Sequence, residues 1–231
     1  MKQWHGHEGD PNAGTLRTQR VDVLRAARRA DYLTDRAGYL CSLAQGKKVL
    51  DCGMVEHTLD AATSPAWLHR KIRDCARECL GVDILAEEIE ALRAAGFNVQ
   101  VLDVTREALP ETFDLIVACE IIEHIDNLGS AFDNWLRMLA PGGRLVITTP
   151  NPWYINCLLK NLRVASRLAE SVDHVGWHEP ATLYELASRH GMKLESYTGL
   201  FVSKTYTTKA RFFFTVASQL TRFGLRYELF S

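Results

Sequence analysis

The sequence predicts an α/β fold, a Rossmann-like, doubly wound and mostly parallel sheet with helices on both faces. Short apolar runs of strand length alternate with segments whose apolar residues recur every three or four positions. The strand runs are apolar on both faces, as in a parallel sheet covered on each side. Four successive runs end in an acidic residue, and ligands of such sheets bind beyond the strands' carboxyl ends. The 231 residues suit one domain of this kind.

The N-terminal part is expected to be a polar tail, residues 1–14, followed by a helix. Apolar positions recur with helical spacing from Leu16 to about Leu43. Arginines lie between them and form either a solvated face or a site for a phosphate-bearing substrate.

Strands and helices then alternate along the rest of the chain. The predicted strands are KKVLDC (47–52), CLGVDI (79–84), NVQVLDV (98–104), FDLIVACE (113–120), RLVITTPN (144–151) and KLESYTGLFV (193–202). The predicted helices are PAWLHRKIRDCA (65–76), AEEIEALRAAG (86–96), NLGSAFDNWLRMLAPGG (127–143) and PATLYELASRHG (180–191). The aromatic-rich segment 210–230 is either a helix and a last strand that cover the core, or a dimer face or a lid over an apolar substrate.

The composition argues against several classes of partner. The formal net charge of −1 gives no global basic field for nucleic acid, and no apolar stretch is long enough to span a bilayer. The N-terminus lacks the apolar core of a signal peptide. The six cysteines form no C-x-x-C pair, which indicates reduced thiols in a cytoplasmic protein.

The acids at the predicted strand ends are Asp51, Asp83, Asp103 and Glu120. An ionised carboxylate accepts hydrogen bonds and donates none, so these strand ends would bind hydroxyls and amines and would repel phosphates. The ligand predicted by this pattern has ribose hydroxyls and an amino group but no phosphate.

The turn after the first strand argues against a dinucleotide. A dinucleotide fingerprint needs three glycines, but Gly53 is followed by Met54, Val55, Glu56 and His57. This loop either binds a nucleotide-like cofactor in an unusual way or has lost that role.

The motifs together resemble those of the class I S-adenosylmethionine-dependent methyltransferases, from about Lys47 to Tyr197. They are VLDCG, GVDI, VLDV, FDLIVACEIIEHI, LAPGGRLVITTPNP and DHVGWHEPATLYELASRHGMKLESY, in this order. Some subgroups also carry a non-glycine loop followed by a WLH-type helix, here Trp67 to His69. The resemblance implies S-adenosylmethionine as cofactor and methylation of a hydroxyl on a small molecule, such as a sugar, a glycan precursor or a secondary metabolite. The alternative is a catalytically inactive binding or regulatory module of the same fold.

The resemblance also divides the chain into residues 1–45, a tail and helix that cover the active site, and residues 46–231, the methyltransferase domain. It implies a cofactor site in which Asp51 and Gly53 flank the methionine moiety and Asp83 accepts from the ribose hydroxyls. The other implied cofactor residues are Ile84 beside Asp83, Asp103 and Val104 at the adenine, Cys119 and Glu120 at the sulfonium and amino group, and His57 from the re-shaped loop. A homodimer is a further expectation.

Three histidines are candidates for the base that takes a proton from an acceptor hydroxyl. His124 follows the fourth strand, and His174 and His178 precede the late helix on the same rim. The pair His174 and His178 is slightly favoured; each could instead only brace or cap the loops. Glu120, Glu123 and His124 also resemble a set that binds a divalent cation in quinone-type O-methyltransferases, but similar letters occur in metal-free relatives, so no metal is predicted.

Overall fold

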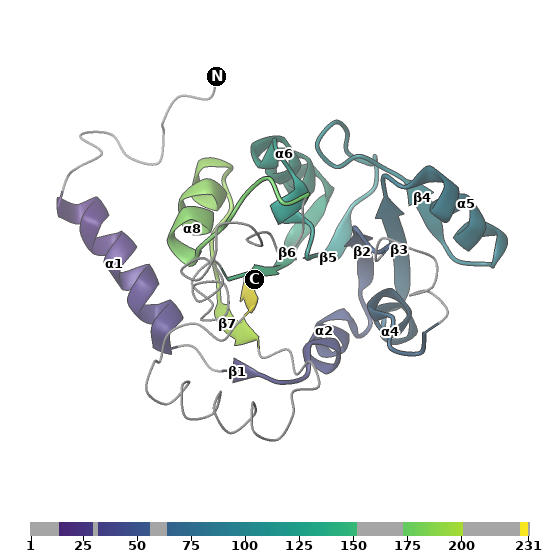
Figure 1. Cartoon of the computed structure of the whole chain (residues 1–231), viewed down its shortest axis with the longest axis horizontal. Coiled ribbons are helices and arrows are strands. Elements are labelled where there is room, and N and C mark those ends of the chain that lie inside the picture. Colours follow the sequence, from purple (N-terminus) through teal and green to yellow (C-terminus); the bar gives the residue numbers. More distant parts are fainter. Residues whose placement is uncertain (1–13, 30–31, 56–63, 152–172, 201–226, 231) are drawn as a thin grey trace, which may run out of the picture.

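The computed structural model describes residues 14–29, 32–55, 64–151, 173–200 and 227–230. These residues form one eight-stranded sheet in the order β1-β7-β8-β6-β5-β2-β3-β4 (Figure 1). Neighbouring strands run parallel except where β8 pairs antiparallel with β6 and β7. The predicted Rossmann-like, mostly parallel sheet is therefore confirmed.

The elements follow the predicted alternation. The strands are β1 (Tyr32–Leu33), β2 (Lys48–Cys52), β3 (Glu78–Asp83), β4 (Val99–Val101), β5 (Phe113–Cys119), β6 (Leu139–Pro150), β7 (Tyr197–Leu200) and β8 (Tyr227–Phe230). The helices are α1 (Gly14–Arg29), α2 (Arg36–Ala44), α4 (Leu68–Cys75), α5 (Ala86–Ala94), the short 3-10 helix η1 (Ile122–His124), α6 (Leu128–Met138) and α8 (Pro180–Arg189).

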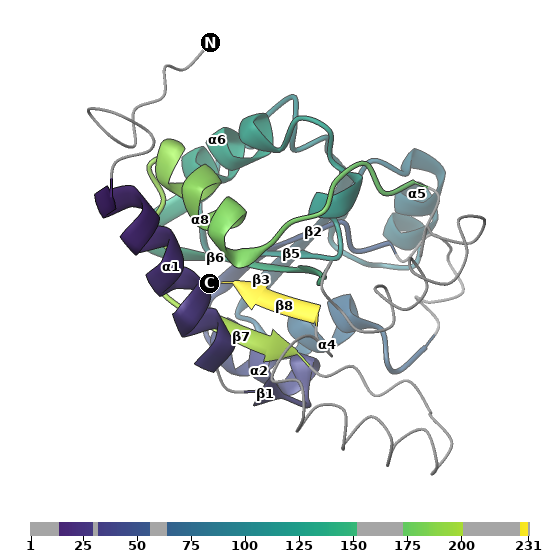
Figure 2. The same cartoon turned by 60° about the vertical axis from the view of Figure 1, so that its left-hand side comes forward.

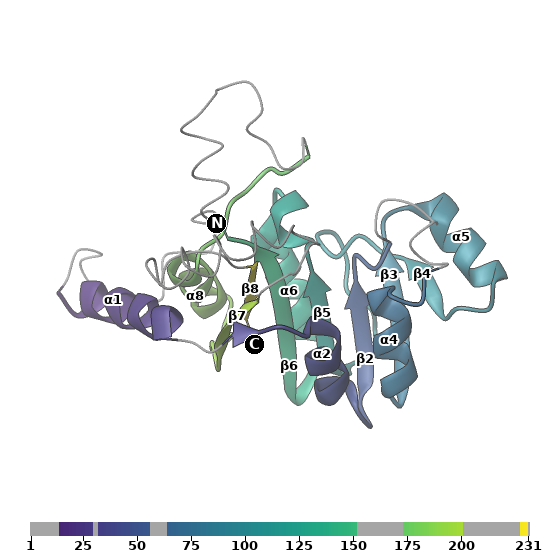
Figure 3. The ribbon, with the colours of Figure 1, turned by 60° about the horizontal axis from the view of Figure 1, so that its bottom comes forward.

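Helices cover both faces of the sheet. On one face lie α6 and α8 (Figure 2). Phe132 and Trp135 of α6 and Leu183 of α8 belong to one apolar cluster with strand residues. On the other face, α2 and α4 pack on the sheet (Figure 3), where Leu40 and Ile72 are fully buried. Burying a side chain of this size stabilises a fold by about 1.5–3 kcal/mol. These two layers hold the strands rigidly enough to position residues at their ends.

The order of the strands reverses between β2 and β5. The chain builds β2, β3 and β4 toward one edge and then returns to place β5 on the other side of β2. At such a switch point the connections after the two strands leave in opposite directions, which opens a crevice at their carboxyl ends.

The predicted single helix from Leu16 to Leu43 is wrong. The strand β1 interrupts it and pairs with β7. Asp35 then caps α2, because its carboxylate accepts a hydrogen bond from the Gly38 amide at 2.9 Å. The helix α1 packs along α8, where Arg20 pairs with Glu179 at 2.9 Å. Residues 32–44 thus belong to the main sheet and its cover.

The predicted helix over 127–143 also ends early. The helix α6 stops at Met138, and the Pro-Gly-Gly turn lies in the irregular first part of β6. Pro141 has no amide hydrogen and cannot continue a helix. The pairing of β5 with β6 shifts register between Phe113 and Leu115, which accommodates the turn.

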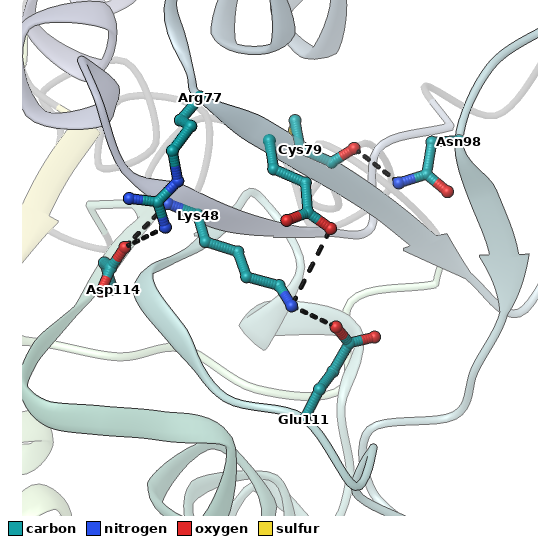
Figure 4. A network of polar contacts seen from close by, with 7 residues as sticks. Lys48, Arg77, Cys79, Asn98, Glu111 and Asp114 are labelled. Atoms are coloured by element: carbon teal, nitrogen blue, oxygen red, sulfur yellow. Dashed lines mark hydrogen bonds and ion pairs between the residues drawn. The ribbon is translucent and has the colours of Figure 1, made fainter.

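Ion pairs and hydrogen bonds link charged residues at the edge of the sheet where the strands begin (Figure 4). This edge lies opposite the carboxyl ends of the strands. The Asp114 carboxylate accepts from the Lys48 backbone amide at 2.8 Å and from Arg77 at 3.3 Å. The Lys48 ammonium pairs with Glu111, which raises the pKa of Lys48. This edge is linked by ion pairs, whereas the carboxyl edge contains a cavity.

None of the described helices has the length and apolar character needed to cross a membrane.

Candidate functional site

A cavity of about 850 Å³ opens at the carboxyl edge of the sheet, beside the switch point. Its size falls in the range of small-molecule sites. Predicted residues that line it are Asp51, Gly53, Asp83, Ile84, Asp103, Val104, Cys119, Glu120 and His124. His174 packs against His124 but, like His178, does not line the cavity itself. His57 falls outside the described residues.

The described part of the glycine-poor first loop, residues 53–55, is held in place by contacts with the rest of the protein. Gly53 has a φ of +71°, and a Cβ there would stand 2.8 Å from Ile121, so the position requires glycine. Met54 and Val55 are buried. The Trp67 indole donates to the Met54 carbonyl at 2.9 Å. The first two non-glycine residues therefore pack into the core and at the same time form part of the cavity wall.

A buried acid–histidine pair lies under this loop. Nδ1 of His69 is 2.8 Å from Oδ2 of Asp51, and both side chains are almost fully buried. The carboxylate accepts, so His69 donates from Nδ1. Asp51 comes from β2 and His69 from the first turn of α4. Both residues line the cavity, but only Asp51 was predicted as a site residue.

Asp83, at the end of β3, accepts two backbone hydrogen bonds. Oδ2 accepts from the Val55 amide at 3.0 Å and Oδ1 from the Leu85 amide at 3.2 Å. Burial raises the pKa of this carboxyl, against the effect of the amides. Each oxygen keeps a further lone pair that ribose hydroxyls could use. Ile84 is 66% exposed and offers an apolar surface beside it.

Asp103 closes the turn after β4. Its Oδ1 accepts from the Thr105 amide at 2.9 Å and from the Thr105 hydroxyl at 2.6 Å. Arg106 pairs with Oδ2 at 3.0 Å. Val104 is buried beside it, and its carbonyl accepts from Asn134 at 2.8 Å. The turn is thus fixed from both sides at the end of the cavity farthest from β6.

Cys119 and Glu120 follow one another at the end of β5. Burial raises the pKa of the Cys119 thiol to about 12, so the thiol stays neutral near pH 7. Glu120 has a φ of +52°, a conformation that costs a non-glycine residue on the order of 1–3 kcal/mol. The Thr148 hydroxyl donates to its carboxylate at 2.6 Å, and Arg36 approaches it at 3.5 Å. Neither Thr148 nor Arg36 was predicted.

The histidines gather on the β5 side of the cavity. Nδ1 of His124 is 3.0 Å from Oδ2 of Asp173, and both residues line the cavity. The His174 ring packs edge-on against His124, with centroids 4.8 Å apart, and also against Trp177. Burial lowers the pKa of His178, which keeps its ring neutral.

A buried carboxyl stands behind these histidines. Glu123 is 2% exposed and accepts from the Thr149 hydroxyl at 3.1 Å. Burial, with the nearby Glu120 charge, raises the pKa of Glu123 to about 8. Ligand atoms of Glu123, His124 and His174 all lie within 4.8 Å of one another. These three residues could therefore hold a metal ion. The set that resembles quinone-type O-methyltransferases has Glu120 in place of His174.

A comparison with protein families decides the identity of the fold. A family profile described as a methyltransferase domain matches residues 24–197, most of the chain. The chain belongs to this methyltransferase family. The predictions of a class I S-adenosylmethionine-dependent methyltransferase, of an enzyme and of its cofactor are confirmed.

Curated relatives of the methyltransferase are similar at low identity. It is 25% identical over 180 residues to the ubiquinone biosynthesis O-methyltransferase of Aeromonas salmonicida, a match that covers 74% of this chain and 72% of the relative. It is 28% identical over 181 residues to the enzyme of the same name from Xylella fastidiosa strain 9a5c, covering 74% and 69%.

Solved structures share the fold of the methyltransferase. A SAM-dependent methyltransferase from Archaeoglobus fulgidus matches with a TM-score of 0.56 and 17% identity, over 93% of this chain and 92% of the other. The N-methyltransferase NodS from Bradyrhizobium japonicum WM9, in complex with S-adenosyl-L-homocysteine, matches with a TM-score of 0.50 and 16% identity, over 97% and 92%.

The hydrogen-bond acceptors that line the cavity fit the cofactor of this family. Carboxylates from three successive parallel strands or the turns after them, Asp51, Asp83 and Asp103, line one wall. They accept hydrogen bonds, which suits hydroxyl and amino groups, and the exposed Ile84 suits a flat ring.

Proposed function

We propose that the methyltransferase methylates a hydroxyl group of a small molecule, with His124 as the base that takes the hydroxyl proton. The observation that carries this proposal is the His124–Asp173 pair on the cavity wall, 3.0 Å between Nδ1 and Oδ2. The names of the O-methyltransferase relatives support the hydroxyl as the acceptor group.

In this proposal the acids of β2, of β3 and of the turn after β4 hold the cofactor. Asp83 accepts from the ribose hydroxyls and Asp51 from the amino group, while Asp103 and Val104 border the adenine. Cys119 and Glu120, at the end of β5, line the same cavity as His124, and the methyl group would lie near them. The cofactor supplies a methyl group already activated by the sulfonium charge, so the protein aligns the acceptor and removes its proton.

The Asp173 contact prepares His124 for this role. A histidine that donates from Nδ1 to a carboxylate keeps Nε2 as the nitrogen that takes a proton, and the carboxylate stabilises the imidazolium that results. His174 packs against the same ring and limits its rotation. The cavity-lining position of His124 favours it over His174 and His178, which reverses the preference drawn from the sequence.

Changing His124 to Ala should lower turnover by about 10²- to 10⁴-fold, the usual contribution of a general base, with S-adenosylhomocysteine affinity near that of wild type. The assay uses labelled cofactor and a panel of phenols, catechols and sugars, and calorimetry measures binding separately. His178→Asn is the matched control and should keep most of the turnover. Normal turnover of His124→Ala on an acceptor that wild type uses would refute the histidine base.

A second means of activating the hydroxyl is a divalent cation. The oxygen and nitrogen donors of Glu123, His124 and His174, within 4.8 Å of one another, are a suitable set. A cation there would lower the pKa of the acceptor hydroxyl. Loss of turnover with a chelator, restored by added Mg²⁺ or Zn²⁺, favours the cation, whereas the histidine base is insensitive to the chelator.

Several expectations from the sequence stay predictions. They are the acceptor class of sugars, glycan precursors or secondary metabolites, the cytoplasmic location, the homodimer, the lack of a nucleic-acid partner, and a role of residues 1–45 in covering the site. The alternative of an inactive binding module predicts cofactor binding without turnover of any acceptor in the panel.

A further inference from the structure

We propose that His69 is a positioning residue for cofactor binding, because it holds the Asp51 carboxylate in place to receive the amino group of the cofactor's methionine moiety. This inference rests on the proposed contact between Asp51 and the cofactor. It assigns a role to the first turn of α4, where His69 ends the WLH sequence noted above.

The geometry of the pair suits this role. Asp51 lies one residue before the end of β2, so its backbone is fixed on both sides by β3 and β5. Its Oδ2 accepts from Nδ1 of His69 at 2.8 Å. The contact fixes the side-chain rotation of Asp51, and the carboxylate has a second oxygen on a residue that lines the cavity. An acceptor fixed before binding loses less conformational entropy when the ligand arrives.

The surroundings of His69 argue that Nδ1 is the reason for a histidine here. Nε2 is buried and has no hydrogen-bond partner among the described residues, which costs stability that an apolar side chain would not lose. The ring packs against Trp67, with centroids 5.0 Å apart. A Cβ on Gly81 would stand 2.7 Å from Cε1 of His69. The protein therefore packs tightly around an imidazole ring of which only Nδ1 has a partner among the described residues.

The same helix start also holds the glycine-poor loop. Glycines in such a loop allow the backbone to approach the cofactor closely. Here Met54 and Val55 turn into the core, and Trp67 binds the Met54 carbonyl at 2.9 Å. Trp67 fixes the loop and His69, two residues later, fixes the acid before it. Recognition of the methionine moiety thus depends on the Asp51 side chain, and His69 orients that side chain.

Two ligands separate this role from a general structural one. S-adenosylhomocysteine carries the amino acid moiety, whereas 5′-methylthioadenosine has the same adenosine but lacks the α-amino and carboxylate groups of that moiety. In calorimetry with the full chain, His69→Ala should weaken S-adenosylhomocysteine binding by about ten- to a hundredfold and 5′-methylthioadenosine binding by less than about threefold. His69→Asn, whose amide can still donate to Asp51, should restore most of the lost affinity. In an Asp51→Asn background, His69→Ala should cause little further loss.

A second variant keeps the test valid if His69→Ala does not fold. Gly81→Ala displaces the ring by steric contact and should reproduce the selective loss, with weaker S-adenosylhomocysteine binding and 5′-methylthioadenosine binding nearly unchanged. Equal losses for both ligands in His69→Ala would overturn the proposal in favour of a scaffold role. Unchanged S-adenosylhomocysteine affinity in Asp51→Asn would overturn the contact on which it rests. If wild type bound neither ligand, the proposed function itself would be wrong.

Discussion

At the scale of single residues, Asp83 serves both the fold and the proposed cofactor site. Its carboxylate accepts the Val55 and Leu85 amides, and we propose that it also accepts the ribose hydroxyls. Asp83→Ala should weaken S-adenosylhomocysteine binding by about ten- to a hundredfold, because charged hydrogen bonds contribute roughly 1.5–3 kcal/mol. Asp83→Asn should lose less, since one acceptor oxygen remains. Calorimetry measures both.

The matched control for Asp83 is Asp74→Ala, which removes an exposed acid at the far end of α4. Its affinity should equal that of wild type. If the two Asp83 variants also bound normally while remaining folded, the ribose site would have to lie elsewhere in the cavity.

Residues at strand ends could be predicted from the sequence, and residues brought in by packing could not. Asp51, Asp83 and Glu120 directly end or follow apolar runs, so the pattern of a parallel sheet places them at one edge. Arg36 and Thr148 reach Glu120 from α2 and β6, and no spacing in the sequence relates them. Their positions depend on how a helix and a distant strand pack on β5.

At the scale of elements, the start of α4 is a clamp on the first loop. Trp67→Phe keeps an aromatic ring but removes the donor to the Met54 carbonyl, which is left buried and unpaired. The free energy of unfolding should fall by about 1–3 kcal/mol, and S-adenosylhomocysteine affinity should fall because the loop shifts. Urea denaturation and calorimetry measure the two effects.

Trp177→Phe is the control for the clamp, since this tryptophan is 46% exposed and lies far along the chain from the loop. Its stability should match that of wild type. A Trp67→Phe protein as stable as Trp177→Phe, with unchanged affinity, would show that packing alone holds the loop.

Element types were predictable where periodicity is strong, and boundaries were not where tertiary contacts act. Helical spacing continues across residues 30–35, yet β1 forms there because β7 offers a parallel partner. The signal that could have found the break is Asp35 three residues before Gly38, a typical N-cap. Similarly, Pro141 marks the limit of α6, but only the pairing with β5 shows that β6 already begins at Leu139.

At the scale of the whole molecule, the two edges of the sheet have different chemistry. The amino edge carries ion pairs around Lys48, which are partly exposed and contribute modestly to stability. The carboxyl edge carries buried acids, of which Glu123 has a pKa raised to about 8 by burial. The stability of the molecule should therefore depend on pH mainly through groups at the site.

Glu123 gives this dependence a definite sign. Its pKa is about 8 in the folded chain against an ordinary value of 4.5, so between these values the unfolded chain releases a proton that the folded chain keeps. The stabilisation is complete below pH 4.5 and is lost as the pH rises through about 8. One such proton gives a slope of at most about −1.4 kcal/mol per pH unit.

Urea denaturation of wild type and Glu123→Gln from pH 5 to 8 measures this effect, because the neutral amide cannot titrate. As the pH rises, the unfolding free energy of wild type should fall relative to that of Glu123→Gln. Glu107→Gln, at an exposed position, should track wild type throughout. Parallel curves for wild type and Glu123→Gln would contradict a protonated buried carboxyl.

The buried Met54 and Val55 in the first loop also have a consequence for the cofactor's exchange. Replacing a glycine by a residue with a side chain narrows the backbone conformations available to a chain, an effect of about 0.4–1 kcal/mol per residue. Because both side chains pack in the core with Trp67, this part of the loop takes its shape when the protein folds. When the demethylated product is released, Met54 and Val55 therefore keep their conformation. They do not have to be ordered again when the next cofactor molecule binds.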